Sequence, residues 1–473
     1  MLYGLLAALA LSVHAVQVEG PGSPANPLRV AVVGAGPAGF YAADALLKQK
    51  GLAVQVDMFE ALPAPYGLVR SGLAPDHQRL KNATKVYDRI AENPGVRYFG
   101  NVAVGRDLSD EDLSRFFDQV VYASGAPEPR ALGVPGEDLA GVHPAAHFIG
   151  WYNSHPAHQD RRFELSGKHA VVIGAGNSAV DVVRLLAQDP AKLADTDIAE
   201  PALAALRGSG VETVTLLARR GPGQAAFSAA ELKQLAELES ADVVVRPGDI
   251  EAARGEALSP SAQKLFDMLA ERAAAGEGAK RRKIRLLFFS QPAELLGADG
   301  RLSGVRVERT RLVPDGKGGL KAEGTGEFET IAADVLFHAI GWKGTPLAGL
   351  PFDARSSRVP SRDSRVVDPA TGRVLPGRYV AGWAKNGGQG LLGDQMRDAA
   401  ATVAAMVADV PSLTPAAERG REAVVEALKA RGARFVTFAD WKRLDALETA
   451  AGAALGKIRE KFSTLAEMLS KLN

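Results

Sequence analysis

The sequence predicts an α/β protein with two separate parallel sheets and a helical C-terminal extension. Two glycine-rich loops carry this prediction, because each follows a strand that is apolar, apart from Arg29 at the start of the first, and precedes a helix. The two loops lie 140 residues apart; they are Gly34-Ala35-Gly36-Pro37-Ala38-Gly39 and Gly174-Ala175-Gly176-Asn177-Ser178-Ala179. A strand, a glycine loop and a helix in this order begin a Rossmann-like βαβ unit, so each loop indicates one dinucleotide-binding domain.

The first unit ends in an acidic residue. Its strand spans 28–33, its helix runs from about 39 to 48, and its second strand, 54–59, ends at Glu60, 21 residues after Gly39. Gly34 forms the turn, Gly36 lets the backbone approach a diphosphate, and Gly39 allows helix and strand to pack closely. The helix N-terminus favours the diphosphate, and Glu60 can accept hydrogen bonds from a free ribose diol. The unit therefore predicts an FAD-type site; the alternative is a tight turn without a ligand.

The second unit ends in basic residues. Its strand spans 170–173, its helix 178–186, and its next strand, 213–217, precedes Arg219 and Arg220. Guanidinium groups bind phosphate through forks of donors, so the pair predicts recognition of the 2′-phosphate of NADPH. The alternative is a solvated strand end. The stretch 188–210 exceeds the minimal unit and predicts an inserted helix. A chain with both kinds of site is most simply a flavoprotein that takes hydride from NADPH.

Composition excludes several other classes of protein. The 473 residues include 56 Lys plus Arg against 55 Asp plus Glu, a formal net charge of +1, so no overall field attracts nucleic acid. The chain has no cysteine. It therefore cannot form a disulfide, a Cys-ligated iron–sulfur cluster or the Cys-x-x-Cys pair of a thioredoxin-type reductase. Electrons that leave the flavin must pass directly to an outside acceptor.

Later strands suggest that one domain is inserted into the other. The strand over 120–126, which brings Gly125 to the cofactor, has a counterpart over 335–341; a strand over 378–383 and a helix over about 396–407 follow. We expect a leader at 1–27, an FAD-binding domain at 28–145 and 331–415, an NADP-binding domain at 146–330, and helices at 416–473 that wrap the FAD domain. The leader is apolar from Leu2 to Val18 but short and impure for a membrane span, and it lacks the basic residues of a signal or transit peptide.

Longer runs resemble one family, the adrenodoxin reductase family of ferredoxin–NADP⁺ reductases. The similarity extends from Leu28 to the end of the chain. The runs that carry it are Tyr66 to His77, Gly150-Trp151-Tyr152-Asn153, Gly174 to Arg184, Arg219-Arg220-Gly221-Pro222 with Gln224 to Phe227, Asp440-Trp441, and Lys457 to Leu469.

The resemblance implies further site residues. It implies FAD contacts at Ala38, Glu60, Leu68, Val104, Trp383, Gly390, Leu391 and Leu392. It implies NADP contacts at Ala175 to Ser178, Arg219, Arg220 and Glu231, with Gly390 shared by the nicotinamide end. His77 and Glu231 would face the flavin–nicotinamide region, and we name them as the catalytic pair. Because hydride transfer needs no general base, a purely structural hydrogen-bonded pair is the alternative.

One segment departs from the family pattern. Where the family commonly has Lys-Arg-Gly-Pro-Thr-Gly-Val-Ile, this chain has the segment from Lys385 to Leu392, followed by Gly393 and Asp394. Gly390 and two apolar residues survive, whereas the Arg, Pro and Thr are absent. We hypothesise that Asp394, if it lies near the pyrimidine edge of the flavin, disfavours the anionic reduced form and lowers the flavin potential.

The resemblance implies an enzyme that passes electrons from NADPH through FAD to an acidic [2Fe-2S] ferredoxin. Lys233 and the run Lys280-Arg281-Arg282-Lys283 are candidates for steering the partner, although such a run is commonly a solvated loop. We expect a monomer with at most peripheral membrane association, located in mitochondria or in another organelle reached through an N-terminal signal. The alternatives are an NADPH:quinone or diaphorase-type reductase and a non-catalytic electron-transfer subunit.

Overall fold

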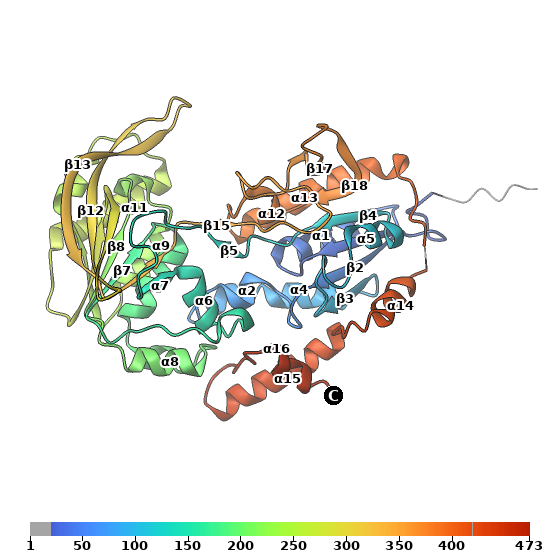
Figure 1. Ribbon diagram of the computed structural model, residues 1–473, viewed down its shortest axis with the longest axis horizontal. Coiled ribbons are helices and arrows are strands. Elements are labelled where there is room, and N and C mark those ends of the chain that lie inside the picture. Colours follow the sequence, from blue (N-terminus) through green and yellow to red (C-terminus); the bar gives the residue numbers. More distant parts are fainter. Residues whose placement is uncertain (1–19, 419) are drawn as a thin grey trace, which may run out of the picture.

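The computed structural model describes residues 20–418 and 420–473. Two α/β bodies lie side by side, and a helical tail runs along their lower side in Figure 1. We call the body that contains the first glycine loop the first domain, and the body that contains the second loop the second domain. Two parallel sheets in two Rossmann-like units confirm the predicted fold class.

The first domain is built on a seven-stranded sheet. Five neighbouring strands are parallel, and two short strands at one edge pair antiparallel. In spatial order they are β16 (Ser361–Arg362), β17 (Arg365–Val367), β18 (Val374–Val380), β4 (Gln119–Tyr122), β1 (Leu28–Val33), β2 (Val54–Glu60) and β3 (Val96–Gly100). Strand β1, which has a parallel neighbour on each side, is buried along its whole length, as its sequence, apolar apart from Arg29, predicts.

Helices cover this sheet on both faces. On one face α1 (Pro37–Leu47) packs against α13 (Leu392–Asp409), and their apolar residues join a core around Val30, Phe40 and Val403. The remaining helices of the first domain are α2 (Leu68–Ser71), α3 (Gln78–Lys81), α4 (Thr84–Ala91), α5 (Asp110–Phe116) and α12 (Trp383–Asn386). The predicted helices over 39–48 and 396–407 are therefore confirmed, with slightly longer bounds.

The second domain contains a six-stranded, entirely parallel sheet. Its order is β6 (Val142–Pro144), β14 (Val335–His338), β7 (His169–Ile173), β8 (Thr213–Leu217), β10 (Arg282–Leu287) and β9 (Ala241–Val245). Its helices are α6 (Ala145–Tyr152), α7 (Asn177–Ala187), α8 (Glu200–Arg207), α9 (Ala229–Ala236), α10 (Pro247–Ala252) and α11 (Pro260–Ala275). Helix α8 is the insertion that the long stretch 188–210 predicts.

A three-stranded antiparallel sheet stands beside the second domain. It consists of β11 (Ser290–Ala298), β12 (Arg301–Pro314) and β13 (Leu320–Ala332), and the last two form the long hairpin at the upper left of Figure 1.

The sheet pairings correct the expected division of the chain. Strands β6 and β14 both belong to the second sheet, where β14 pairs with β7 from Val335 to His338. The expected boundaries at 145/146 and 330/331 would separate both strands from that sheet. The apolar runs at 120–126 and 335–341 look alike in sequence, and apolar character does not reveal which sheet a strand joins.

Two features connect the domains. The two segments of chain that pass between the domains pair with each other as a short antiparallel ribbon. It consists of β5 (Glu128–Pro129) and β15 (Trp342–Lys343) and lies in the middle of Figure 1. The tail forms α14 (Ala423–Ala430), α15 (Phe438–Ala454) and α16 (Leu465–Ser470), as its composition predicts. Within the described residues, no helix is long and apolar enough to cross a membrane. The apolar leader from Leu2 to Val18 lies outside the described residues.

Candidate functional site

At two positions of the first glycine loop, nearby backbone carbonyls leave no room for a side chain. Gly34 has φ +107°, and a Cβ there would lie 2.4 Å from the Ala123 carbonyl oxygen; a Cβ on Gly39 would lie 2.0 Å from the Gly34 carbonyl oxygen. Only glycine fits at either position. Gly36 differs, because the nearest atom to its Cβ position, Gly67 Cα, is 3.9 Å away. The chain itself therefore leaves the space beside Gly36 open, as close approach of a diphosphate requires.

Glu60 lies directly beside this loop. Its Oε2 atom accepts a hydrogen bond from the Ala35 amide at 3.0 Å, and its Oε1 atom accepts one from Leu62 at 3.2 Å. Burial raises the pKa of the Glu60 carboxyl, although the backbone amides oppose the shift. Each carboxylate oxygen retains acceptor capacity, so the predicted contact with a ribose diol is chemically available.

The other residues expected at the flavin lie in several segments of the first domain. Leu68 begins α2 directly after Gly67, Gly125 follows β4 with φ +75°, and Val104 is half-buried beyond β3. Trp383 donates a hydrogen bond from Nε1 to the Gly390 carbonyl at 3.0 Å, and this contact folds the divergent segment back onto α12. Leu391 is 66% exposed and Leu392 starts α13.

Ala38 connects two of these segments. A Cβ on Gly382 would lie 2.6 Å from the Ala38 Cβ. The first glycine loop and the segment after β18 are therefore in direct contact. Side-chain contacts with FAD remain expectations.

The second loop repeats this geometry. Gly174 has φ +128°, and its Cβ position lies 2.4 Å from the Ala339 carbonyl oxygen, whereas no atom lies within 4 Å of the Cβ position on Gly176. The Ala175 carbonyl accepts hydrogen bonds from the amides of Ala226 and Phe227 at 2.8 and 2.9 Å, which fixes the loop against the chain after Arg220. Asn177, at the start of α7, buries an Oδ1 atom that has no partner among the described residues.

A cavity of about 810 Å³ opens beside this second loop. Its wall includes Gly174 to Gly176 and four cationic side chains, which are Arg130, Lys343, Arg219 and Arg220. Arg219 and Arg220 are exposed, and within the described part of the chain neither guanidinium has a hydrogen bond or an ion pair. Their backbone carbonyls are bonded: the Arg219 carbonyl accepts from Thr310 Oγ1 at 2.7 Å, and the Arg220 carbonyl accepts from the Phe289 amide at 3.1 Å. Free guanidinium groups beside an open glycine loop fit a phosphorylated ribose.

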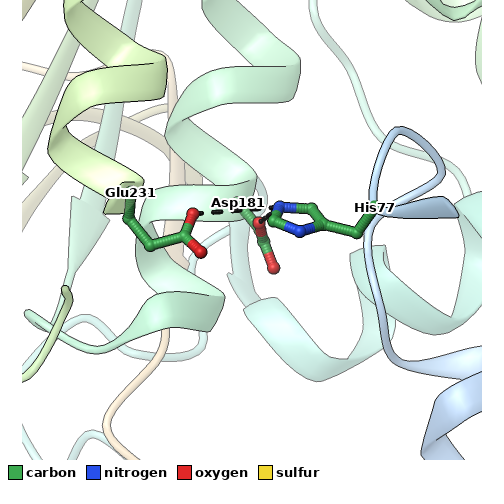
Figure 2. A group of neighbouring side chains, drawn as sticks. All are labelled: His77, Asp181 and Glu231. Atoms are coloured by element: carbon green, nitrogen blue, oxygen red, sulfur yellow. Dashed lines mark ion pairs between the residues drawn. The ribbon is translucent and has the colours of Figure 1, made fainter. Parts of the chain in front are cut away.

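His77 and Glu231 meet where the two domains touch. The His77 Nε2 atom lies 3.8 Å from Glu231 Oε2 and 3.1 Å from Asp181 Oδ1 (Figure 2). His77 precedes α3 in the first domain, Asp181 lies on α7, and Glu231 lies in the first turn of α9, where Ser228 caps the helix. The structure thus brings the predicted pair together and adds a carboxylate that the sequence analysis did not single out.

A buried arginine organises these acids. Arg184, 2% exposed, lies 2.7 Å from Asp181 and 3.3 Å from Glu231, and it holds Asp76 through two hydrogen bonds at 2.8 and 2.9 Å. Contact with the Asp181 carboxylate raises the pKa of His77, and burial raises the pKa of Glu231. Burial alone would raise the pKa of Asp76, but Arg184 outweighs it and the pKa is lowered. Two charged residues inside the apolar helix 178–186 were the available sequence signal for this network.

Sequence comparisons connect these features to known proteins. A family model described as pyridine nucleotide-disulphide oxidoreductase matches residues 28–238. The NADPH-ferredoxin reductase FprA of Mycobacterium tuberculosis is 40% identical over 457 residues, which cover 94% of this chain and 99% of the relative. The mitochondrial NADPH:adrenodoxin oxidoreductase of Arabidopsis thaliana is 37% identical, over 94% of this chain and 95% of the relative.

A solved structure agrees over the same length. Mycobacterium tuberculosis FprA in complex with NADPH superposes with a TM-score of 0.89 at 38% identity, over 94% of this chain and all of that one. The chain belongs to the adrenodoxin reductase family. This confirms the family predicted from the sequence. Relatives occur in mitochondria and in bacteria, so a mitochondrial location stays a prediction.

Unlike the disulphide oxidoreductases in the description of the family model, this adrenodoxin reductase homologue has no cysteine that could form a redox-active disulfide.

Basic side chains of the run 280–283, which were candidates for steering a partner, form contacts within the protein. Lys280 donates to the carbonyls of Leu238 and Ala241, and Lys283 pairs with Asp242 at 2.9 Å. Lys233 remains exposed but lies 3.6 Å from Glu237.

Proposed function

We propose that the protein is an FAD-dependent NADPH–ferredoxin reductase, with FAD at the first glycine loop and NADPH at the second. The observation that carries this proposal is the contrast between the two loops: Glu60 lies beside the first, and the unpaired Arg219 and Arg220 line the cavity beside the second. The proposal is supported by the similarity to FprA, named an NADPH-ferredoxin reductase, and to the plant relative, named an NADPH:adrenodoxin oxidoreductase. The open Cβ positions at Gly36 and Gly176 and the orphaned Asn177 Oδ1 fit two dinucleotides.

The residues of the chain bind and orient the two dinucleotides. Bound FAD supplies a ring that accepts two electrons as hydride and releases them singly. The loop amides and the N-termini of α1 and α7 stabilise the two diphosphates. Arg219 and Arg220 hold the 2′-phosphate and so select NADPH over NADH.

His77 and Glu231 lie where the two domains face each other, and Arg184 fixes the Glu231 carboxylate. We assign His77 and Glu231 to orienting the carboxamide of the nicotinamide. The Glu231 carboxylate can accept from the carboxamide N–H, and a protonated His77 imidazole can donate to the carboxamide oxygen.

The electron acceptor in this proposal is an acidic [2Fe-2S] ferredoxin that binds a monomer of the reductase. Such a carrier takes one electron at a time. Reduction of ferredoxin should exceed reduction of a quinone, and its rate should fall steeply with added salt, because opposite charges steer association. Equal rates with quinone, with no dependence on salt, would favour a diaphorase-type activity instead.

The nucleotide preference tests the proposal directly. Purified protein should be yellow, and anaerobic NADPH should bleach its visible flavin absorbance promptly. Changing Arg219 and Arg220 together to Ala should weaken NADPH binding about 100-fold and leave the weaker NADH binding nearly unchanged, since two charge-assisted contacts are lost. Arg254→Ala is the control, because Arg254 is exposed and, among the described residues, its side chain pairs with Glu251 alone, three positions earlier. A colourless protein, or an intact protein that prefers NADH, would refute the proposal.

A further inference from the structure

The covalent connection between the two domains is slight. It consists of the ribbon β5–β15, in which only Trp342 pairs with Pro129 and Lys343 with Glu128, extended by the Arg130 amide that donates to the Gly341 carbonyl at 3.1 Å. A two-stranded ribbon of this length is weak by itself, and domains joined in this way are expected to move relative to each other. Other contacts must fix the angle between the domains.

The tail supplies such contacts on another side of the molecule. Helix α15 is anchored to the first domain, where Trp441 donates from Nε1 to the Tyr66 hydroxyl at 2.9 Å and the buried Glu448 pairs with Arg70. Residues 455–463, which we call the strap, then reach the second domain. In Figure 1, α15 lies below the first domain, with its far end towards α8 of the second domain, whereas the ribbon β5–β15 crosses between the two bodies above it.

The strap binds the segment that precedes α8. The Ile458 amide donates to the Asp195 carbonyl at 3.0 Å, and Lys457 Nζ donates to the Ile198 carbonyl at 2.6 Å and pairs with Glu200 at 2.8 Å. The Lys457 side chain is 1% exposed. These are contacts of a packed interface, whereas a solvated loop would leave this lysine in water.

Asp197 joins three parts of the chain at this point. It is 5% exposed and lies 2.7 Å from Lys81 Nζ on α3 and 2.8 Å from Lys461 Nζ on the strap. Gln78 donates to the same carboxylate at 3.0 Å, and Asn153 accepts from both lysines at 3.3 and 3.2 Å. The buried Asp197 carboxylate of the second domain therefore pairs with two buried lysines, Lys81 on α3 of the first domain and Lys461 on the strap. Burial lowers the pKa of Lys461 to about 7 against the opposing effect of Asp197.

Removing Asp197 would take away the carboxylate that pairs with Lys81 and Lys461, so each amine would either remain as a buried charge, with Arg70 also nearby, or give up its proton. An uncompensated buried charge is strongly destabilising, so the strap and α3 would separate from the second domain. Helix α3 follows His77 directly, so any shift of α3 also moves His77 relative to Asp181 and Glu231.

We propose that Asp197 is a positioning residue: with Lys81 and Lys461 it fixes the second domain at the angle that hydride transfer requires. This inference rests on the proposed function, because it assumes that NADPH on one domain reduces flavin on the other. A displacement of about 1 Å can lower the rate of such a reaction about 100-fold. Asp197 touches neither loop, so its loss should reduce the rate of transfer without a comparable loss of nucleotide affinity.

The test compares Asp197→Asn with Asp249→Asn. Asp249 is a matched control because it is fully buried and bonded at 2.8 Å to Arg309 on β12, so this pair joins the second domain to the sheet beside it and does not involve the first domain. Asp197→Asn should lower the single-turnover rate of flavin bleaching by NADPH at least about tenfold and change the dissociation constant of NADP⁺ less than about threefold. Asp197→Glu, which restores the charge, should recover part of the rate, and Asp249→Asn should leave the rate near that of the wild type.

Domain orientation is measured separately. Because the chain has no cysteine, spin labels can be placed at Lys85→Cys on α4 and Arg207→Cys on α8, both exposed. The distance distribution between the labels should broaden or shift in Asp197→Asn and stay unchanged in Asp249→Asn. If Asp197→Asn does not fold, Lys461→Met provides the same two measurements. Unchanged rates and distances in a folded variant would overturn the inference. A wild type that NADPH does not bleach would overturn the proposed function, while the distances would still test the domain contact.

Discussion

The Nε2 atom of His77 lies 3.1 Å from Asp181 Oδ1, and this contact joins the two domains. It differs from the expected pairing with Glu231 in being shorter, and Asp181 itself is held by Arg184 at 2.7 Å. His77 is therefore surrounded by Asp181, Glu231, Asp76 and the opposing charge of Arg184. In this setting the charge of the imidazole contributes to the stability of the fold.

This contact predicts a pH-dependent contribution of His77 to stability. The raised pKa of folded His77 means that its stabilising effect is complete below the unfolded pKa and is lost as the pH rises through the folded pKa. The free-energy cost of His77→Gln should therefore be larger at about pH 5.5 than at about pH 8.5, by about 1 kcal/mol. Urea unfolding at both pH values measures it. In an Asp181→Asn background the difference should shrink, and an equal cost at both pH values would contradict the assignment.

Replacing Gly34 and replacing Gly36 by alanine are predicted to have different effects, the first on folding and the second on flavin binding. Gly34→Ala should unfold or strongly destabilise the protein, because its Cβ would lie 2.4 Å from the Ala123 carbonyl oxygen at a positive φ. Gly36→Ala meets only Gly67 Cα at 3.9 Å, so the apoprotein should keep its melting temperature within a few degrees while flavin retention falls sharply. Calorimetry of the apoprotein and flavin titration separate the two effects. If Gly36→Ala lost as much stability as Gly34→Ala, then Gly36 would be required for the fold itself and not for the approach of a diphosphate.

Much of the fold could be predicted, because the local sequence pattern of several elements matches the place that each element takes in the structure. The strand β1 is apolar apart from Arg29 and has a parallel neighbour on each side, and the over-long stretch 188–210 contains α8. The placement of β14 could not be predicted, because an apolar strand followed by small residues fits either sheet. Pairing depends on contacts distant in sequence, which composition does not encode.

The site was predicted less completely than the fold. Glycine loops, an acid and an arginine pair occur at fixed spacings, so Glu60 and Arg219 could be found from the sequence. Asp181 and Asp197 form contacts with residues about 100 positions away, such as His77 and Lys81. Asp181 was indicated only by its place inside an apolar helix. Asp197 follows the polar residues Asp195 and Thr196 and was not indicated, and neither position identifies its partners.

The last prediction concerns Asp394, whose effect on the flavin potential remains a hypothesis. The structure places its carboxylate at the start of α13, where Oδ2 accepts from the Leu391 amide at 2.8 Å and Oδ1 pairs with Arg397. The Leu391 amide and Arg397 hold its pKa below the usual range, so it is ionised at neutral pH. If this charge acts on the reduced flavin, Asp394→Asn should raise the two-electron potential. Because the hydrogen bond from the Leu391 amide is weakened, the variant should also be slightly less stable. Asp440→Asn, which weakens the equivalent cap of α15, should lose similar stability and leave the potential unchanged. Equal potentials in wild type and Asp394→Asn would refute the hypothesis and leave Asp394 as a helix cap alone.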